Sequence, residues 1–103
     1  MENIQNAEVI NNEAQRQFEI QMNGFISKIP YNIKDDMMAL LNTEVPDELK
    51  GRGVASILAL YALNYAKDHH LKISTHCPFI TRYIKEHPEW KSYVKNSPTI
   101  RNR

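Results

Sequence analysis

The sequence predicts a small α+β domain in which a mixed sheet carries two main helices. Three observations lead to this fold class. Apolar residues alternate with polar ones through 18–22, the hairpin dipeptide Asn23-Gly24 follows, and apolar residues at helical spacing fill 54–65. Hairpins that lead into a strand–helix–strand–helix run predict antiparallel N-terminal strands and one parallel crossover.

The first half of the chain is expected to form strands joined by tight turns. A weakly signalled strand near 7–11 precedes the alternating strand 18–22, and a third strand is expected over 25–33. Pro30 lies in that third strand, which indicates an edge strand or a bulge, because proline cannot donate a ladder hydrogen bond. The stretch 37–45 is apolar on both faces, as is typical of a covered central strand.

The second half is expected to form a helix, a strand and two further helical segments. The helix carries one apolar stripe and a second face of alanines, and it should end near His69-His70. The stripe consists of Val54, Ile57, Leu58, Tyr61, Ala62 and Tyr65, and the alanines are Ala55, Ala59 and Ala66. A strand over 71–75 follows, Cys77-Pro78 opens a second helix, and Pro88 starts a short last helix.

Bulk properties place the chain among compact proteins of ordinary composition. Of 103 residues, 42% are hydrophobic and 24% charged, with a formal net charge of +1, so no basic footprint predicts nucleic-acid binding. The single cysteine, the lack of a leader-like pattern and the lack of a long apolar run favour a cytoplasmic monomer without membrane contact. We expect one domain over 7–95, flexible ends at 1–6 and 96–103, and no metal site.

The segment 43–55 suggests a seat for a phosphate or pyrophosphate. It reads as the end of a strand, a loop with Gly51 and Gly53, and the first turn of the apolar helix. The first amides of a helix lack intrahelical partners and lie at the positive end of the helix dipole, so they attract anions. Glycines let the backbone approach such an anion, although the same pattern also occurs in an ordinary turn before a helix.

The motif T-E-V-P-x-E-L-x-G-x-G-V-A, followed by C-P-F, Tyr83 and H-P-E, resembles the small YjdJ-type branch of the GNAT N-acetyltransferase superfamily over 18–94. The resemblance implies acetyl-CoA as co-substrate, held where strands 40–45 and 71–75 splay apart. The wider superfamily has Arg or Gln where this chain has Glu48, as small-branch members do. The implied cofactor-binding residues are Val45 for pantetheine, Pro78, and, around the pyrophosphate, Lys50, Gly51, Arg52, Gly53, Val54, Ala55 and Ser56.

Cys77 is a candidate for chemistry because it lies between a strand and a helix. A thiol at a helix N-terminus is favoured as thiolate, so Cys77 is a candidate acetyl acceptor or a neighbour of the thioester. A buried, inert thiol is the alternative, because free cysteine often packs as a small apolar residue. His76 is adjacent in sequence, but neighbours on a strand point to opposite faces, so the two do not form a dyad by adjacency.

The resemblance also implies a role for Tyr83, because a tyrosine on this helix protonates the departing CoA thiolate in many GNAT enzymes. A core aromatic is the alternative interpretation of Tyr83, and His87 could act as a cation at the helix C-terminus.

Two positions depart from the small-branch pattern, since Asn42 replaces a histidine and Thr75 replaces a proline. Asparagine cannot accept a proton, so Glu44, on the same strand face, or a water would have to serve as base.

Three functions are compatible with these residues. The first is an acetyl-CoA-dependent N-acetyltransferase that acts on an amine of a small molecule or a protein, with the oxyanion held by backbone N–H groups of the splayed strand. The second is a non-catalytic acyl-CoA-binding or sensing module that lost its base at Asn42. The third is an interaction protein that pairs through a sheet edge, for which the strand with Pro30 is the candidate.

Overall fold

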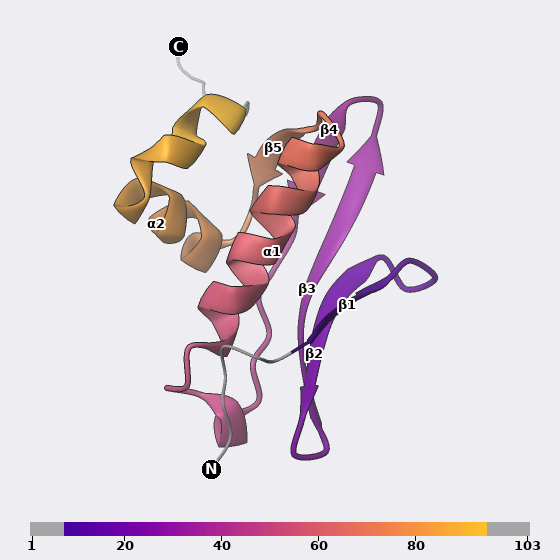
Figure 1. The fold of residues 1–103 in the computed structure, drawn as a ribbon, viewed down its shortest axis with the longest axis vertical. Coiled ribbons are helices and arrows are strands. Elements are labelled where there is room, and N and C mark those ends of the chain that lie inside the picture. Colours follow the sequence, from indigo (N-terminus) through magenta and orange to yellow (C-terminus); the bar gives the residue numbers. More distant parts are fainter. Residues whose placement is uncertain (1–7, 95–103) are drawn as a thin grey trace.

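A computed structural model describes residues 8–94 and forms a two-layer α+β fold, with a five-stranded sheet on one side and helices on the other (Figure 1). The predicted flexible ends, 1–6 and 96–103, lie outside the described residues. The elements are β1 (Val9–Asn12), β2 (Gln17–Met22), β3 (Phe25–Lys34), β4 (Met37–Leu40), η2 (Asp47–Leu49), α1 (Val54–Asp68), β5 (Lys72–Thr75), α2 (Pro78–Glu86) and η3 (Pro88–Tyr93).

The antiparallel half of the sheet follows the sequence prediction. Strands β1, β2, β3 and β4 pair in chain order, each antiparallel to the next. Asn23 and Gly24 both have positive φ, 56° and 82°, as the tight β2–β3 turn requires. The weakly signalled first strand is confirmed as β1, although it begins at Val9.

The parallel half contains the crossover and the point where two strands diverge. β4 pairs parallel with β5 from Met37↔Lys72 to Leu40↔Thr75, and α1 connects them. The last link is the His76 N–H, which donates to the Leu40 carbonyl at 2.9 Å. Beyond it the chain after β4 remains paired with β3 through Lys28, while the chain after β5 turns into α2. The predicted splayed pair is therefore present.

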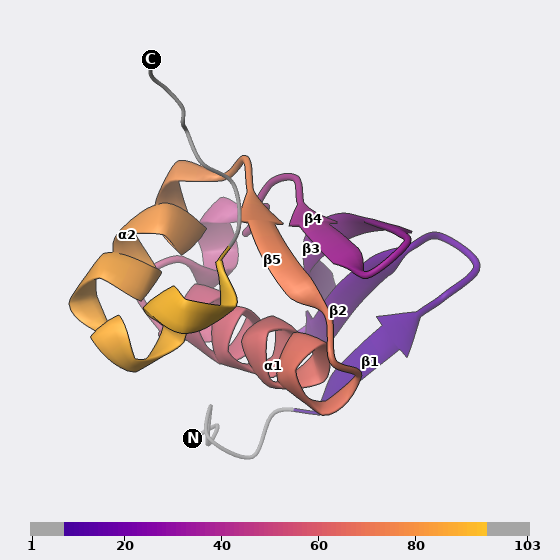
Figure 2. The same cartoon turned by 90° about the horizontal axis from the view of Figure 1, so that it is seen from above.

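Both α1 and α2 lie on the same side of the sheet, as the view from above shows (Figure 2). A single core joins them to the strands and includes Phe18, Ile29, Leu40, Leu58, Leu63, Ile73, Ile80 and Trp90.

The buried stripe of α1 is rotated relative to the prediction. Ala59, Leu63 and Ala66 are fully buried, whereas Tyr61 is 37% exposed, because the small alanines let the helix approach the sheet closely.

The opposite face of the sheet carries no helix of residues 8–94, so 37–45 is not the doubly covered strand that its composition predicts. Met38 and Leu40 are fully buried, but Leu41 is 43% exposed and Met37 and Ala39 are half-buried. We call this side the open face. Its other exposed apolar residues are Ile10 and Ile26.

A β-bulge lies beside Pro30. The Leu41 N–H donates to the Pro30 carbonyl at 3.0 Å, and the next paired residues are Lys28 and Glu44, which exchange two backbone bonds of 2.9 Å. Two steps along β3 thus face three steps along its partner, so Asn42 and Thr43 together oppose one residue of β3. The prediction of an edge strand is wrong, because β3 is paired on both sides, whereas the bulge alternative is correct.

Both main helices end in a stacked tyrosine–histidine pair. The rings of Tyr65 and His69 lie 3.9 Å apart between centroids, and those of Tyr83 and His87 lie 4.1 Å apart. In each pair the histidine Nδ1 lies 2.8 Å from the carbonyl oxygen of the tyrosine four residues earlier. The Tyr65 carbonyl also accepts the His69 backbone N–H at 3.0 Å, whereas the His87 backbone N–H donates to the Ile84 carbonyl, so at Tyr83 the ring bond is the one that the histidine supplies.

Candidate functional site

A cavity of about 840 Å³ lies where the chains after β4 and β5 diverge. It reaches from the open face, where Ile26 and Lys28 of β3 line it, to Ala55 in the first turn of α1. The remaining lining residues are Thr43, Glu44, Val45, Pro46, Lys50, Phe79 and Arg82. The cavity therefore passes the gap that opens when the parallel pairing ends.

The glycine loop forms a second, adjoining cavity of about 210 Å³, which shares Val45, Lys50, Ala55 and Phe79 with the first. Gly51 and Gly53 have φ of 80° and 78°, a backbone conformation that glycine adopts without strain. A Cβ built on either glycine would meet no heavy atom within 4 Å, so the space above the loop is open.

The N-terminus of α1 points its amides toward this loop without a competing cap. Gly53 is the N-cap residue, and among residues 8–94 no capping side chain hydrogen-bonds to the first turn. The amides of Val54, Ala55 and Ser56 are thus available to a phosphate, which is the arrangement that helix N-termini offer to anions.

Three cations line the larger cavity: Lys28 on β3, Lys50 directly after η2, and Arg82 on α2. Lys50 Nζ lies 2.9 Å from Asp47 Oδ1, and its hydrogen bond and charge lower the pKa of Asp47. The Arg82 guanidinium lies over the Phe79 ring, 5.9 Å from the centroid. With Glu44 as the one anion in the lining, the cavity carries a net positive charge suited to phosphates.

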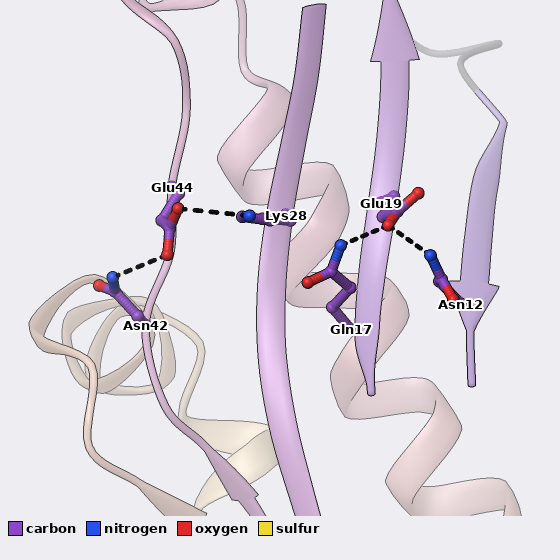
Figure 3. Close-up of polar contacts among 6 residues, drawn as sticks. All are labelled: Asn12, Gln17, Glu19, Lys28, Asn42 and Glu44. Atoms are coloured by element: carbon purple, nitrogen blue, oxygen red, sulfur yellow. Dashed lines mark hydrogen bonds and ion pairs between the residues drawn. The ribbon is translucent and has the colours of Figure 1, made fainter. Parts of the chain in front are cut away.

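Glu44 lies at the open-face end of the cavity between two partners (Figure 3). Its Oε1 is 3.8 Å from Lys28 Nζ, and its Oε2 accepts a hydrogen bond from Asn42 Nδ2 at 3.3 Å. Asn42 and Glu44 therefore lie side by side, as predicted. The Glu44 side chain is 48% exposed, so solvent reaches it.

Glu19 forms a second carboxylate cluster on the open face, one strand away from Lys28 (Figure 3). Gln17 Nε2 and Asn12 Nδ2, the latter at 2.8 Å, donate to Glu19 Oε2. The hydrogen bond from Gln17 and then that from Asn12 hold the pKa of Glu19 below its ordinary value. Glu19 is only 5% exposed, so this charge is fixed in place beside the cavity.

The bulge next to Glu44 leaves backbone donors unused. No backbone bond between residues of 8–94 engages the N–H of Asn42 or of Thr43, although the flanking Leu41 and Glu44 amides are both paired. Thr43 lines the cavity, so its amide is a donor of the kind that an oxyanion requires.

Cys77 is buried at the edge of this region. Its side chain is 3% exposed, and its Sγ lies 3.1 Å from Thr43 Oγ1, which does line the cavity. His76 is exposed and contacts Ser74 Oγ instead, at 3.1 Å, so the structure does not join His76 and Cys77.

Tyr83 lies one turn beyond Phe79 on α2, with 6.4 Å between the ring centroids. Burial, and secondarily the charge of Glu89, raise its pKa, so the phenol remains protonated at neutral pH.

Most of the site residues predicted from sequence line these two cavities: Glu44, Val45, Lys50, Gly51, Gly53, Val54, Ala55 and Ser56. The predicted residues outside the lining are Arg52, Cys77, Pro78 and Tyr83.

The cavity lining also includes residues that were not predicted as site residues from the sequence, namely Lys28, Thr43, Phe79 and Arg82. Phe79 and Arg82 are three apart on α2, a spacing that places both on one helix face and could have indicated them. Lys28 had no such signal, because its place at the cavity depends on the pairing of β3 with the chain after β4.

Comparisons with known proteins agree with this geometry. The sequence profile of the GCN5-related N-acetyl-transferases matches residues 17–93. Protein NATD1 of mouse is 37% identical over 76 residues, which cover 71% of this chain and 69% of the mouse protein. Protein NATD1 of chicken is 34% identical over 84 residues, which cover 79% of this chain and 76% of the chicken protein.

A solution structure of a GCN5-like protein from Staphylococcus aureus shares the fold, with a TM-score of 0.70 over 95% of this chain and 97% of that one, at 23% identity. This chain belongs to the GCN5-related N-acetyltransferase family, whose members generally use acetyl-CoA. Within residues 8–94, no helix is long and apolar enough to cross a membrane.

Proposed function

We propose that this protein is an acetyl-CoA-dependent N-acetyltransferase that transfers an acetyl group to an amine of a small molecule or a protein. The observation that carries the proposal is the continuous lining from the glycine loop, past the end of the parallel strands, to Glu44. Acetyl-CoA is the substrate that supplies the activated acyl group, and its length and charge distribution suit a channel with a phosphate seat at one end.

The glycine-loop end would bind the pyrophosphate through the amides of 53–56, assisted by Lys50 and Arg82. Arg52 extends from the same loop, and Val45 would pair with the pantetheine arm through its backbone. Both amides and cations favour a dianionic group there, so this end supplies most of the binding free energy.

The opposite end would carry the chemistry. The free N–H groups of Asn42 and Thr43 would stabilise the oxyanion that forms on the thioester carbonyl, and Glu44 would accept the proton that the attacking amine loses. The main contribution of the chain is then to hold thioester and amine in one geometry.

Tyr83 and Cys77 complete the proposed site. A phenol that remains protonated at neutral pH is suited to donate its proton to the departing thiolate, which supports that role for Tyr83. Burial of Cys77 against Thr43 favours a place beside the thioester, with Pro78 behind it, over a role as nucleophile. We further propose that the protein acts as a monomer in the cytoplasm.

A second candidate function rests on Asn42. Because asparagine cannot accept a proton, the chain could bind acyl-CoA without turning it over, as a binding or sensing module. Binding and turnover therefore have to be measured separately.

The test is a pair of glycine variants, Gly53→Ala and Gly24→Ala. Both positions have nearly the same φ, 78° and 82°, and neither offers a contact to an added Cβ, so the backbone strain is matched. Only Gly53 lies at the proposed phosphate seat. We expect Gly53→Ala to weaken acetyl-CoA binding about tenfold or more in calorimetry, and Gly24→Ala to leave it nearly unchanged.

Equal affinities for the two variants would contradict the phosphate seat. Turnover with a panel of amines, followed by release of the CoA thiol, then decides between the two functions. Acetyl-CoA binding without any turnover would favour the binding module over the enzyme.

A further inference from the structure

Lys28 presents an amine inside the cavity at the end opposite the phosphate seat. Its Nζ lies 3.8 Å from Glu44 Oε1, and its side chain is 36% exposed. Two backbone bonds of 2.9 Å between Lys28 and Glu44 fix the relative positions of the two side chains. The pairing of the two backbones therefore keeps a potential nucleophile, the Lys28 amine, next to the Glu44 carboxylate.

Lys50 lines the same cavity but occupies its other end. It also lines the glycine-loop cavity, and its Nζ is held by Asp47 at 2.9 Å. Lys28 shares its end with Thr43 and Glu44, next to the unused amides of the bulge. Lys34, on the same strand and also exposed on the open face, lines neither cavity.

We propose that Lys28 is a site of self-acetylation, at which the protein transfers the acetyl group of acetyl-CoA to its own side chain. The inference rests on the proposed function, because it needs acetyl-CoA bound with its thioester toward Glu44. Lys28 differs from an external acceptor in being permanently present at high effective concentration.

The Lys28 ammonium first releases one proton to solvent, and the neutral Nζ attacks the thioester carbonyl carbon. An N–C bond forms while the C–S bond breaks. The second proton leaves Nζ for the Glu44 carboxylate, which returns it to solvent. Tyr83 donates its phenol proton to the departing CoA sulfur and regains a proton from solvent, so the products are Nε-acetyl-lysine and CoA thiol.

Acetylation would also change the open face. It removes the positive charge that lies between Glu19 and Glu44 and thereby breaks the ion pair with Glu44. Glu44 would then retain Asn42 as its described hydrogen-bond partner.

The experiment uses the full chain and acetyl-CoA with no added amine. Intact-mass and peptide mass spectrometry should show one acetyl group on Lys28, added about tenfold or more faster than on Lys34. The rate constant should not depend on protein concentration, because the amine and the bound acetyl-CoA belong to one molecule. Lys28→Arg should remove this fast modification, and Lys34→Arg, the matched control on the same strand, should leave it intact.

Gly53→Ala supplies a second control, since it should slow the modification of Lys28 without changing the slow background at exposed Lys67 and Lys85. Acetylation of Lys28 no faster than that of Lys34, or preferential acetylation of Lys50, would overturn the inference. Turnover of external amines with Lys28 unmodified overturns this inference alone. A failure to bind acetyl-CoA overturns the proposed function and this inference with it.

Discussion

The two faces of the sheet differ in the kind of side chain that they carry. The helix-covered face is largely apolar, and its buried Ser27 Oγ has no hydrogen-bond partner among residues 8–94. The open face carries Glu19 on β2, Lys28 on β3 and Glu44 on the chain after β4, and each of these charges has a partner. The difference indicates that the covered face supplies stability, whereas the open face positions charge beside the cavity.

The largest effect is expected from the covered face. Leu58 is fully buried in α1, whereas Leu60 in the same helix is 42% exposed. We expect Leu58→Ala to lower the free energy of unfolding by about 2–5 kcal/mol, because it loses apolar burial and leaves a cavity. Leu60→Ala should change it by less than about 0.5 kcal/mol. Urea unfolding measures both, and equal losses would contradict the assignment of the core to this face.

A smaller effect is expected from the open face, and it should depend on pH. Because hydrogen bonds lower the pKa of folded Glu19 below its ordinary value of 4.5, its charge stabilises the fold above about that pH. The stabilisation is lost as the pH falls through the lowered pKa of the folded state. At pH 7 we expect Glu19→Gln to cost about 1–3 kcal/mol, since hydrogen bonds to a charged group are replaced by weaker ones.

The matched control for Glu19 is Glu13→Gln, in the exposed turn between β1 and β2. Urea unfolding between pH 3 and pH 7 should show the wild type and Glu19→Gln converging as the pH falls, while Glu13→Gln follows the wild type. A constant difference across that range would show that the charge of Glu19 does not stabilise the fold.

The smallest effect is expected at the boundary between the faces, where Asn42 contacts Glu44. Asn42→His should raise the acetylation rate about tenfold near neutral pH, because an imidazole can accept the proton of the amine. Acetyl-CoA affinity should stay the same, since the phosphate seat is elsewhere. An unchanged rate and pH profile would exclude this position as the site of the missing base.

The fold could be predicted where local periodicity decides structure. Alternation located β2, the Asn23-Gly24 pair located the hairpin, and the spacing of apolar residues located α1. The covered side of 37–45 could not be predicted, because composition does not tell whether a helix packs on each face of a strand.

The site was predictable where its residues are close together in sequence, at the glycine loop and at Glu44 and Val45. The glycine loop is contiguous in sequence, so its lining residues were found. The bulge at 42–43 and the place of Lys28 depend on register between two strands, and Arg82 depends on the packing of α2. Register is not encoded in the pattern of either strand alone, so these features required the structure.

The tyrosine–histidine pairs at the ends of α1 and α2 fix which ring nitrogen of each histidine carries the hydrogen. A carbonyl oxygen only accepts hydrogen bonds, so Nδ1 of His69 and of His87 must carry a hydrogen. Each imidazole can therefore bind a partner outside its helix at Nε2 while the Nδ1 hydrogen stays on the helix end.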